Sequence, residues 1–129
     1  MNYDEFIGAV SQRGGLSREQ AEVLARATLE TLAELVTPKE VEDLAAQLPK
    51  PLKEPLSPRD RTESFGLEEF VSRVRERAQV STPLAAIGVK AVLTTVREAV
   101  SEGEFEDVMA QLPEEYSDVI GPTDWRGRP

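Results

Sequence analysis

The sequence contains no cysteine and no histidine among its 129 residues. Without cysteine the chain has no disulfide, no thiol nucleophile and no thiolate ligand for a metal ion. Without histidine it lacks the side chain that serves most often as a general base and as a ligand for transition metals. We therefore predict a protein that is not an enzyme, with no catalytic, cofactor-binding or metal-binding residue.

Long apolar runs are missing as well. No stretch approaches the roughly 18 consecutive apolar residues of a membrane-spanning helix. Residues 1–5, MNYDE, have neither the basic start nor the apolar run of a secretory signal. These absences predict a soluble, cytoplasmic protein that does not insert into a membrane.

Positive charge is scarce relative to negative charge. The chain has 15 lysines and arginines against 24 aspartates and glutamates, which gives a formal net charge of −9. A nucleic-acid-binding protein needs basic side chains to neutralise phosphates, so we do not expect a nucleic-acid partner. The same acidic excess disfavours adsorption to anionic lipid.

The chain does contain an internal repeat with an offset of 64 residues. Phe6 aligns with Phe70 at this offset, and Val10 aligns with Val74, without any gap. The densest block places Glu40, Glu42, Asp43, Ala46, Gln47, Leu48 and Pro49 on Glu104, Glu106, Asp107, Ala110, Gln111, Leu112 and Pro113. Such a repeat indicates one supersecondary unit used twice.

Each copy has the pattern of three helices. In the first copy, apolar residues at helical spacing predict a helix over residues 3–13 that stops at Gly14 and Gly15. Ser17 and Gln20 form a capping-box pattern that predicts a long second helix to about residue 36. Glu22, Arg26, Glu30 and Glu34 recur every four residues and predict the solvent-facing side of that helix. 

The third helix of each copy is predicted from its cap. Thr37 and Pro38 suit the cap and the first helical position, and Glu40 stands where a capping box places its acidic residue. Ser101 and Glu104 repeat this pattern in the second copy. A short last helix is expected within residues 114–120.

The resulting fold prediction is all-α, with two tandem copies of a three-helix unit and about six main helices in a pseudo-symmetric bundle. Residues 1–50 form the first repeat, residues 51–66 a proline-rich polar linker, residues 67–121 the second repeat and residues 122–129 a flexible tail. Leu24 is replaced by Gly88 at the repeat offset. Either the two long helices cross closely at Gly88, or the glycine is a tolerated weak turn of a helix.

Several of these patterns are similar to a known family. The frame Tyr3-x-x-Phe6, the long helix and the closing block with Gln47-Leu48-Pro49 resemble the bacterial and archaeal domain-of-unknown-function family number 2267. The resemblance covers roughly residues 2–121. It implies a helical fold with this kind of duplication, and it supplies no established activity and no functional residues.

Three groups of polar residues are candidate sites. The acidic starts of the third and sixth helices, which include Glu40 and Glu104, suit the helix dipole and capping better than a metal ion. The arginines at 73, 75 and 77 suit a solvated face paired locally with Glu69 and Glu76. The recurring hydroxyls are expected in caps or within the long helices: Ser17, Ser81, Thr31 and Thr95.

The C-terminal tail carries the remaining candidate. Trp125 and Arg126 follow Asp124 in a segment rich in glycine and proline. A lone tryptophan on such a segment is suited to anchor a protein partner. It could instead fold back on its own domain or have no role.

Function is inferred mostly by elimination. We expect a non-enzymatic protein–protein interaction or scaffold module with an unknown protein partner, and self-association into a homodimer is compatible with that expectation. The alternative is a small-ligand or lipid-binding helical module with an apolar cavity between the repeats.

Overall fold

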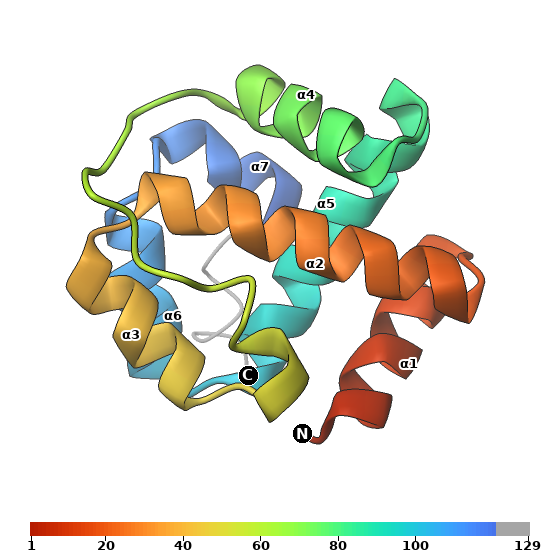
Figure 1. Ribbon diagram of the computed structural model, residues 1–129, viewed down its shortest axis with the longest axis horizontal. Helices are drawn as coiled ribbons and strands as arrows, with labels where there is room; N and C mark the ends of the chain where they lie inside the picture. The colour runs from red at the N-terminus through yellow and green to blue at the C-terminus, as the bar shows by residue number, and fades with distance from the viewer. Residues whose placement is uncertain (121–129) are drawn as a thin grey trace, which may run out of the picture.

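A computed structural model describes residues 1–120, and every regular element in this range is helical, which confirms the all-α class (Figure 1). The helices are α1 Tyr3–Gly14, α2 Arg18–Leu35, α3 Pro38–Ala46, α4 Leu67–Ala78, α5 Thr82–Ala99, α6 Glu102–Ala110 and α7 Ser117–Ile120. Two short 3-10 helices, η1 Lys50–Leu52 and η2 Glu114–Tyr116, follow α3 and α6. The short last helix expected within residues 114–120 is present as η2 and α7.

The ends of α1 and α2 lie where their caps predict. Asn2 and Glu5 form a capping box at the start of α1, and Gly15 ends that helix with a φ of 62°. Only a residue that tolerates the left-handed region fits this position easily, which explains the glycine. Ser17 accepts a hydrogen bond from the backbone N–H of Gln20, whose side chain bonds back to Ser17, as predicted.

The caps of α3 and α6 differ from the prediction in one respect. Thr37 and Ser101 do cap these helices through their hydroxyls. However, the N–H of Thr37 donates to Oε1 of Gln111 at 2.7 Å, and the N–H of Ser101 donates to Oε1 of Gln47 at 2.7 Å. The capping-box role predicted for Glu40 is therefore wrong, because a glutamine from the other half of the chain takes it.

The helices of the two halves have matching lengths. The bounds of α4, α5 and α6 follow those of α1, α2 and α3 by 64 residues at both ends, with lengths of 12, 18 and 9 residues in each half. The two halves are also interleaved, because α1 and α4 each contact both α2 and α5. The third helices of the halves, α3 and α6, lie side by side (Figure 1).

The two long helices α2 and α5 contact each other in the core, and Leu24 lies directly against Gly88 in this contact. A Cβ atom built on Gly88 would lie 2.7 Å from Cδ2 and 3.0 Å from Cβ of Leu24. Both residues are buried. The close crossing at Gly88, one of the two readings of the sequence, is therefore the one observed.

The segment between the halves packs against the first half. Leu52 and Leu56 are each 3% exposed and join the hydrophobic core. Farther along, Arg59 donates to the carbonyl oxygen of Glu30, and the N–H of Glu63 donates to the carbonyl oxygen of Glu34. Residues 51–66 therefore include a buried apolar turn and a stretch bonded to α2.

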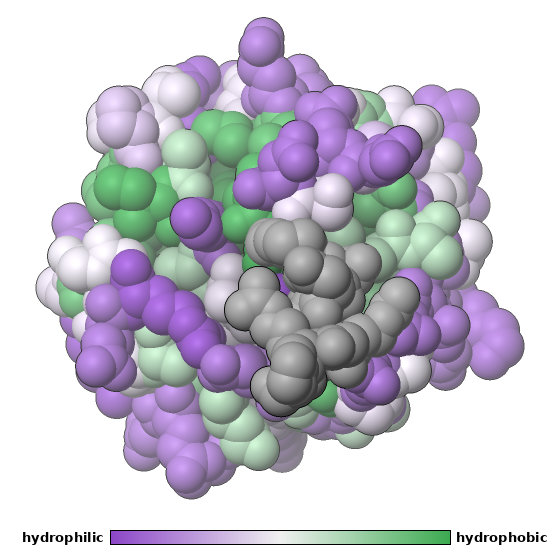
Figure 2. Space-filling view, turned by 180° about the vertical axis from the view of Figure 1, so that it is seen from behind, coloured by the Kyte–Doolittle hydropathy of each residue, from purple (hydrophilic) through white to green (hydrophobic). Residues whose placement is uncertain are grey.

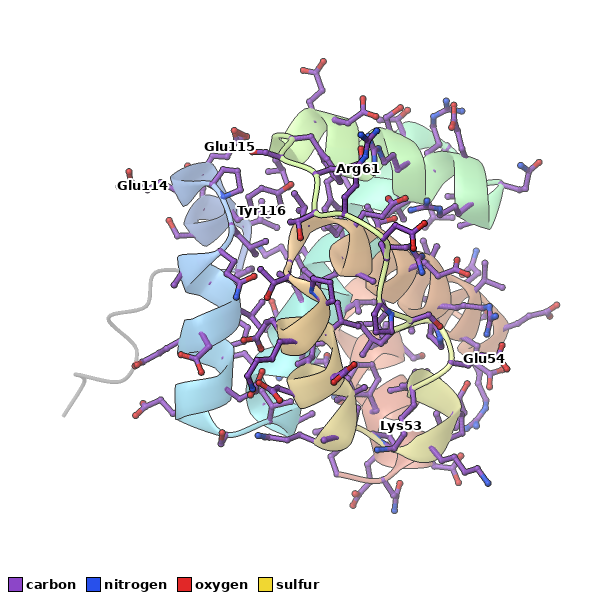
Figure 3. All side chains as sticks on the ribbon, turned by 60° about the vertical axis from the view of Figure 1, so that its left-hand side comes forward. Lys53, Glu54, Arg61, Glu114, Glu115 and Tyr116 are labelled. Atoms are coloured by element: carbon purple, nitrogen blue, oxygen red, sulfur yellow. The ribbon has the colours of Figure 1, made fainter. Side chains whose placement is uncertain are left out.

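An aromatic group joins the end of the second half to the start of α4. Figure 3 shows Tyr116 on the inner side of η2 and Glu114 on the outer side. The Tyr116 ring meets that of Phe70 edge to face at 5.7 Å between centroids, and its hydroxyl donates to the carbonyl oxygen of Phe65. Glu115 accepts the first N–H of α4, from Leu67.

No single helix within residues 1–120 has the length and apolar composition needed to cross a membrane. Within the same residues, α4 and α5 together satisfy the criteria of length and composition, but the chain bends by 104° between them.

Candidate functional site

Two aliphatic side chains, Val23 and Ile87, lie on the surface of the long helices. Val23 is 42% exposed and Ile87 is 45% exposed, and within the described part of the chain only Met1 is a comparably exposed large hydrophobic residue. Their sequence positions are 64 residues apart, so each occupies the same place in its helix. Both therefore form the first candidate for an interaction surface.

The exposure of these residues follows from the crossing of α2 and α5. Val23 directly precedes Leu24, and Ile87 directly precedes Gly88, the two residues in contact at the crossing. Successive residues of an α-helix point about 100° apart, so the two neighbours of a crossing residue lie on different sides of it: Ala25 and Val89 are buried, whereas Val23 and Ile87 are exposed. The fold thus places two exposed aliphatic side chains beside the crossing of α2 and α5.

A shallow hollow of about 360 Å³ surrounds Val23. Ala78 and Val80, from the end of α4 and the turn after it, form its apolar side. The polar side comes from the first turn of α2, where Glu19 supplies a negative charge. This hollow is therefore apolar at its centre and acidic at one edge.

A second hollow of about 330 Å³ lies beside Ile87 and has the opposite charge. Arg13 and Lys90 border it, together with Ala91 and Thr94. Ile87 also lies against the end of α1, since a Cβ on Gly14 would be 3.2 Å from its Cγ2 atom. The space-filling view from behind shows hydrophobic residues gathered on the side of the molecule where α5 begins (Figure 2).

A third hollow, of about 610 Å³, lies between the starts of α4 and α5 and the turn η2. Leu67 and Val71 contribute its apolar surface, while Glu68, Arg75 and Glu115 surround it with charge. Neither aliphatic residue is as exposed as Val23 or Ile87. This hollow is therefore a weaker candidate for contact with a partner.

Two arginines tie the halves together with the same set of bonds. Nη1 of Arg77 donates to the hydroxyl of Thr31 at 2.7 Å, and the guanidinium pairs with Glu34 at 2.7 Å. These bonds join α4 to α2.

Arg13, 64 positions before Arg77, makes the corresponding contacts between α1 and α5. It donates to the hydroxyl of Thr95 at 2.8 Å and pairs with Glu98. The hydroxyls of Thr31 and Thr95 also donate hydrogen bonds to backbone carbonyl oxygens one turn earlier in their own helices. These polar groups are thus satisfied internally, which indicates a structural role.

Glu34 does not face solvent as the four-residue spacing predicted. Its side chain is 14% exposed and binds both Arg73 and Arg77. Burial raises the pKa of Glu34, but hydrogen bonds from Arg77 and Arg73 outweigh burial and leave that pKa below the ordinary 4.5. The arginine segment is correspondingly more than a locally paired face, although Arg73 does pair with Glu69 at 2.8 Å as predicted.

The remaining predicted sites are the helix caps, the acidic helix starts and the tail. Ser17 and Ser81 are helix caps, as predicted. Glu40 and Glu104, predicted to serve the helix dipole and capping, are buried at 5% and 9% exposure. Within residues 1–120 no group of three or more acidic side chains is placed to hold a metal ion. The predicted docking residues of the tail, Trp125 and Arg126, lie outside the described residues.

The sequence pattern at Val23 and Ile87 indicates core residues and not surface residues. Both are aliphatic at equivalent repeat positions, and Val23 belongs to the broad apolar surface of α2. Helical periodicity alone counts such residues with the core. Their exposure depends on where the other half of the chain packs, which periodicity does not contain.

Comparison with known proteins gives a family and no activity. A family model described as "Uncharacterized conserved protein (DUF2267)" matches residues 3–119, which confirms the family resemblance of the sequence. A search of curated proteins finds no match.

Proposed function

We propose that this chain, which belongs to the DUF2267 family of uncharacterized conserved proteins, is a non-enzymatic module that binds a protein partner through Val23 and Ile87. The observation that carries the proposal is the exposure of these two aliphatic side chains, because among the large hydrophobic residues described only Met1 is similarly exposed. Contiguous apolar patches bordered by polar residues are typical of protein-binding surfaces, and Val23 adjoins Ala78 and Val80 in a hollow of this kind.

The two hollows specify the chemistry of the partner. Each hollow accepts an aliphatic side chain against Val23 or Ile87. Glu19 favours a basic group next to the first, and Lys90 favours an acidic group next to the second. We take the partner to be a different protein, since the net charge of −9 disfavours the approach of a second copy of this chain.

The proposal includes the internal duplication. Two tandem copies of one three-helix unit, over residues 1–50 and 67–121, would be related by an approximate twofold axis. Support comes from the equal helix lengths and from the exchanged bonds of Gln47 with Ser101 and of Gln111 with Thr37. Such an axis would present Val23 and Ile87 as a pair, each beside its own hollow.

The ligand-binding alternative has less support. It requires an apolar cavity between the halves, and Leu24 fills the space next to Gly88 at the crossing of α2 and α5. The hollows described above lie at the surface and have charged borders. Neither feature favours the enclosure of an apolar small molecule.

The test uses the full chain as bait in three versions. These are the unchanged chain, V23S/I87S and the matched control A86S, since Ala86 is exposed and adjacent to Ile87 but carries only a methyl group. A protein recovered with the unchanged chain is identified by mass spectrometry and purified, and its Kd for each version is measured. We expect V23S/I87S to weaken binding at least about tenfold, while A86S leaves it unchanged.

Equal Kd values for the unchanged chain and V23S/I87S would contradict the proposed surface. A version that ends at Gly121 separates this surface from the tail. If that truncation abolishes binding and V23S/I87S does not, the contact belongs to Trp125. Sedimentation equilibrium tests whether the partner is a second copy of this chain. If the unchanged chain is a dimer and V23S/I87S is a monomer, the surface binds another copy.

A further inference from the structure

The side chains of Glu40 and Glu104 are buried where α3 meets α6. Each residue lies in the first turn of its helix, and their exposures are 5% and 9%. One oxygen of each carboxyl group, Oε2, is buried and has no hydrogen-bond partner among the described residues. Two ionised carboxylates in such a place are strongly unfavourable unless something neutralises them.

Helix capping does not account for this burial. A glutamate at this position ordinarily reaches back to the N–H of the capping residue. In α3 and α6 those N–H groups instead donate to the side chains of Gln111 and Gln47 at 2.7 Å. The two glutamates are therefore released from capping, and their carboxyl groups turn into the contact between the helices.

Positive charge does not account for it either. The charged groups that act most on the carboxyl of Glu40 are Glu104 and Asp107 from α6 and Asp43 from α3 itself, and all are acidic. The nearby cation, Lys39, is directed to Asp43 at 3.4 Å with its side chain 85% exposed. Burial, followed by contact with Glu104, raises the pKa of Glu40 to about 8.

A single proton resolves the arrangement. When one carboxyl group is protonated, its O–H can donate to the other carboxylate, which supplies a partner for the buried oxygens and leaves only one negative charge. Removing that proton leaves two facing anions. We propose that Glu40 and Glu104 share one proton that fastens α3 to α6, and that loss of this proton to alkaline solvent loosens the contact between these helices.

The consequence reaches beyond the two carboxyl groups. The bonds from Thr37 to Gln111 and from Ser101 to Gln47 cross the same contact, at the starts of the same helices. Separation of α3 from α6 would therefore break them as well. This proposal concerns the contact of α3 with α6, whereas Val23 and Ile87 belong to α2 and α5.

The direct test is titration of the glutamate side-chain carboxyl carbons by NMR in the full chain, with E40Q and E104Q to assign the two signals. We expect one of the pair to titrate well above 4.5 in the unchanged chain. In E104Q the amide donates permanently to Glu40, so the titration of Glu40 should move toward lower pH. Ordinary titration of both carboxyls in the unchanged chain would overturn the proposal.

Hydrogen exchange tests the loosening itself. After correction for intrinsic exchange rates, the amides of α3 and α6 should lose protection relative to those of α1 and α4 by about tenfold or more between pH 6 and pH 9. The matched control E42Q, at an exposed acid of α3, should behave like the unchanged chain, while E104Q should remove the pH dependence. If the protection of these amides does not depend on pH in the unchanged chain, the proposed role of the shared proton is contradicted.

A metal ion bound between the carboxyl groups of Glu40 and Glu104 is the alternative to a shared proton. If the unchanged chain and E42Q bind Ca²⁺ or Mg²⁺ at pH 7 and E104Q does not, the two carboxylates are ionised and hold a metal ion. That result would replace the shared proton and overturn the proposal.

Discussion

The side chain of Leu24 occupies the space that a side chain on Gly88 would need. A Cβ on Gly88 would approach Cδ2 of Leu24 to 2.7 Å and its Cβ to 3.0 Å, so the leucine could not clear it by rotation of its end alone. The two positions are 64 residues apart in a chain whose helix bounds repeat at that interval. One large and one small residue thus fill a place where two leucines would collide.

G88A should destabilise the protein by about 1–2 kcal/mol. Overpacking against Leu24 costs roughly 1–3 kcal/mol, and the better helix propensity of alanine recovers up to about 1 kcal/mol. Urea unfolding followed by circular dichroism measures the change. The control is G8A in α1, where a Cβ meets nothing within 4 Å, so the propensity gain should stabilise the protein.

A double-mutant cycle isolates the contact between positions 24 and 88. In the L24A background the contacts at 2.7 and 2.8 Å with the ends of the leucine are gone and only the 3.0 Å contact with Cβ remains, so G88A should cost less than in the unchanged chain. A cost for G88A that is the same in both backgrounds would mean that the strain does not come from Leu24.

T28V should stabilise the protein by about 1 kcal/mol. Thr28 is fully buried in α2, and its hydroxyl has no hydrogen-bond partner among the described residues. Valine has nearly the same shape and removes the unsatisfied group. The corresponding residue of α5, Val92, already shows that a valine is accommodated at this position of the helix. A rise in urea midpoint for T28V, with no change in the slope, is the expected result.

Glu34 should govern the acid side of the stability profile. Its folded pKa lies below the ordinary 4.5, because bonds from Arg77 and Arg73 outweigh burial. The folded state then binds fewer protons than the unfolded state, so this stability is present above about pH 4.5 and is lost as the pH falls through the folded pKa. Urea midpoints measured from pH 6 down to pH 2 should fall less steeply in E34Q.

The matched control for E34Q is E98Q. Glu98 makes the corresponding ion pair with Arg13, but its side chain is 48% exposed, compared with 14% for Glu34. At neutral pH we expect E34Q to cost on the order of 1–3 kcal/mol, because it weakens a partly buried network of charged hydrogen bonds. E98Q should cost less than about 1 kcal/mol. Equal costs would contradict the difference in burial.

Glu40 has the opposite effect on the alkaline side. Its folded pKa is about 8, above the ordinary 4.5, so the folded state binds the extra proton. Stability should therefore be fully present below about pH 4.5 and decline as the pH rises through about 8. Urea midpoints from pH 5 to pH 9 should decline in the unchanged chain and in E42Q, and stay nearly flat in E104Q. A decline in E104Q equal to that of the unchanged chain would assign the effect to other groups.

Much of the fold was predictable because its signals are local. Ser17 with Gln20 and the left-handed Gly15 determine where helices begin and end through contacts within a few residues. The repeat offset likewise predicted corresponding helices in the two halves. By contrast, the partners of Thr37 and Ser101 are 74 and 54 residues away, and no local pattern identifies them.

The site was less predictable for the same reason. Glu40 has the sequence context of an exposed capping residue, and only the approach of α6 makes it a buried one. Val23 has the periodicity of a core residue, and only the place of the other half leaves it exposed. Each environment is set by packing between segments far apart in sequence. Composition did indicate the class of function proposed, because cysteine and histidine are absent from the whole chain.

The most direct test of the proposed surface is site-specific photo-crosslinking with a benzophenone side chain placed at position 23, 87 or 42. Positions 23 and 87 lie on the proposed surface, and Glu42 is an exposed residue of α3 that serves as the control. We predict that the same partner protein is captured from positions 23 and 87 and not from position 42. Capture from position 42 alone, or equally from all three positions, would contradict a partner-binding role for Val23 and Ile87.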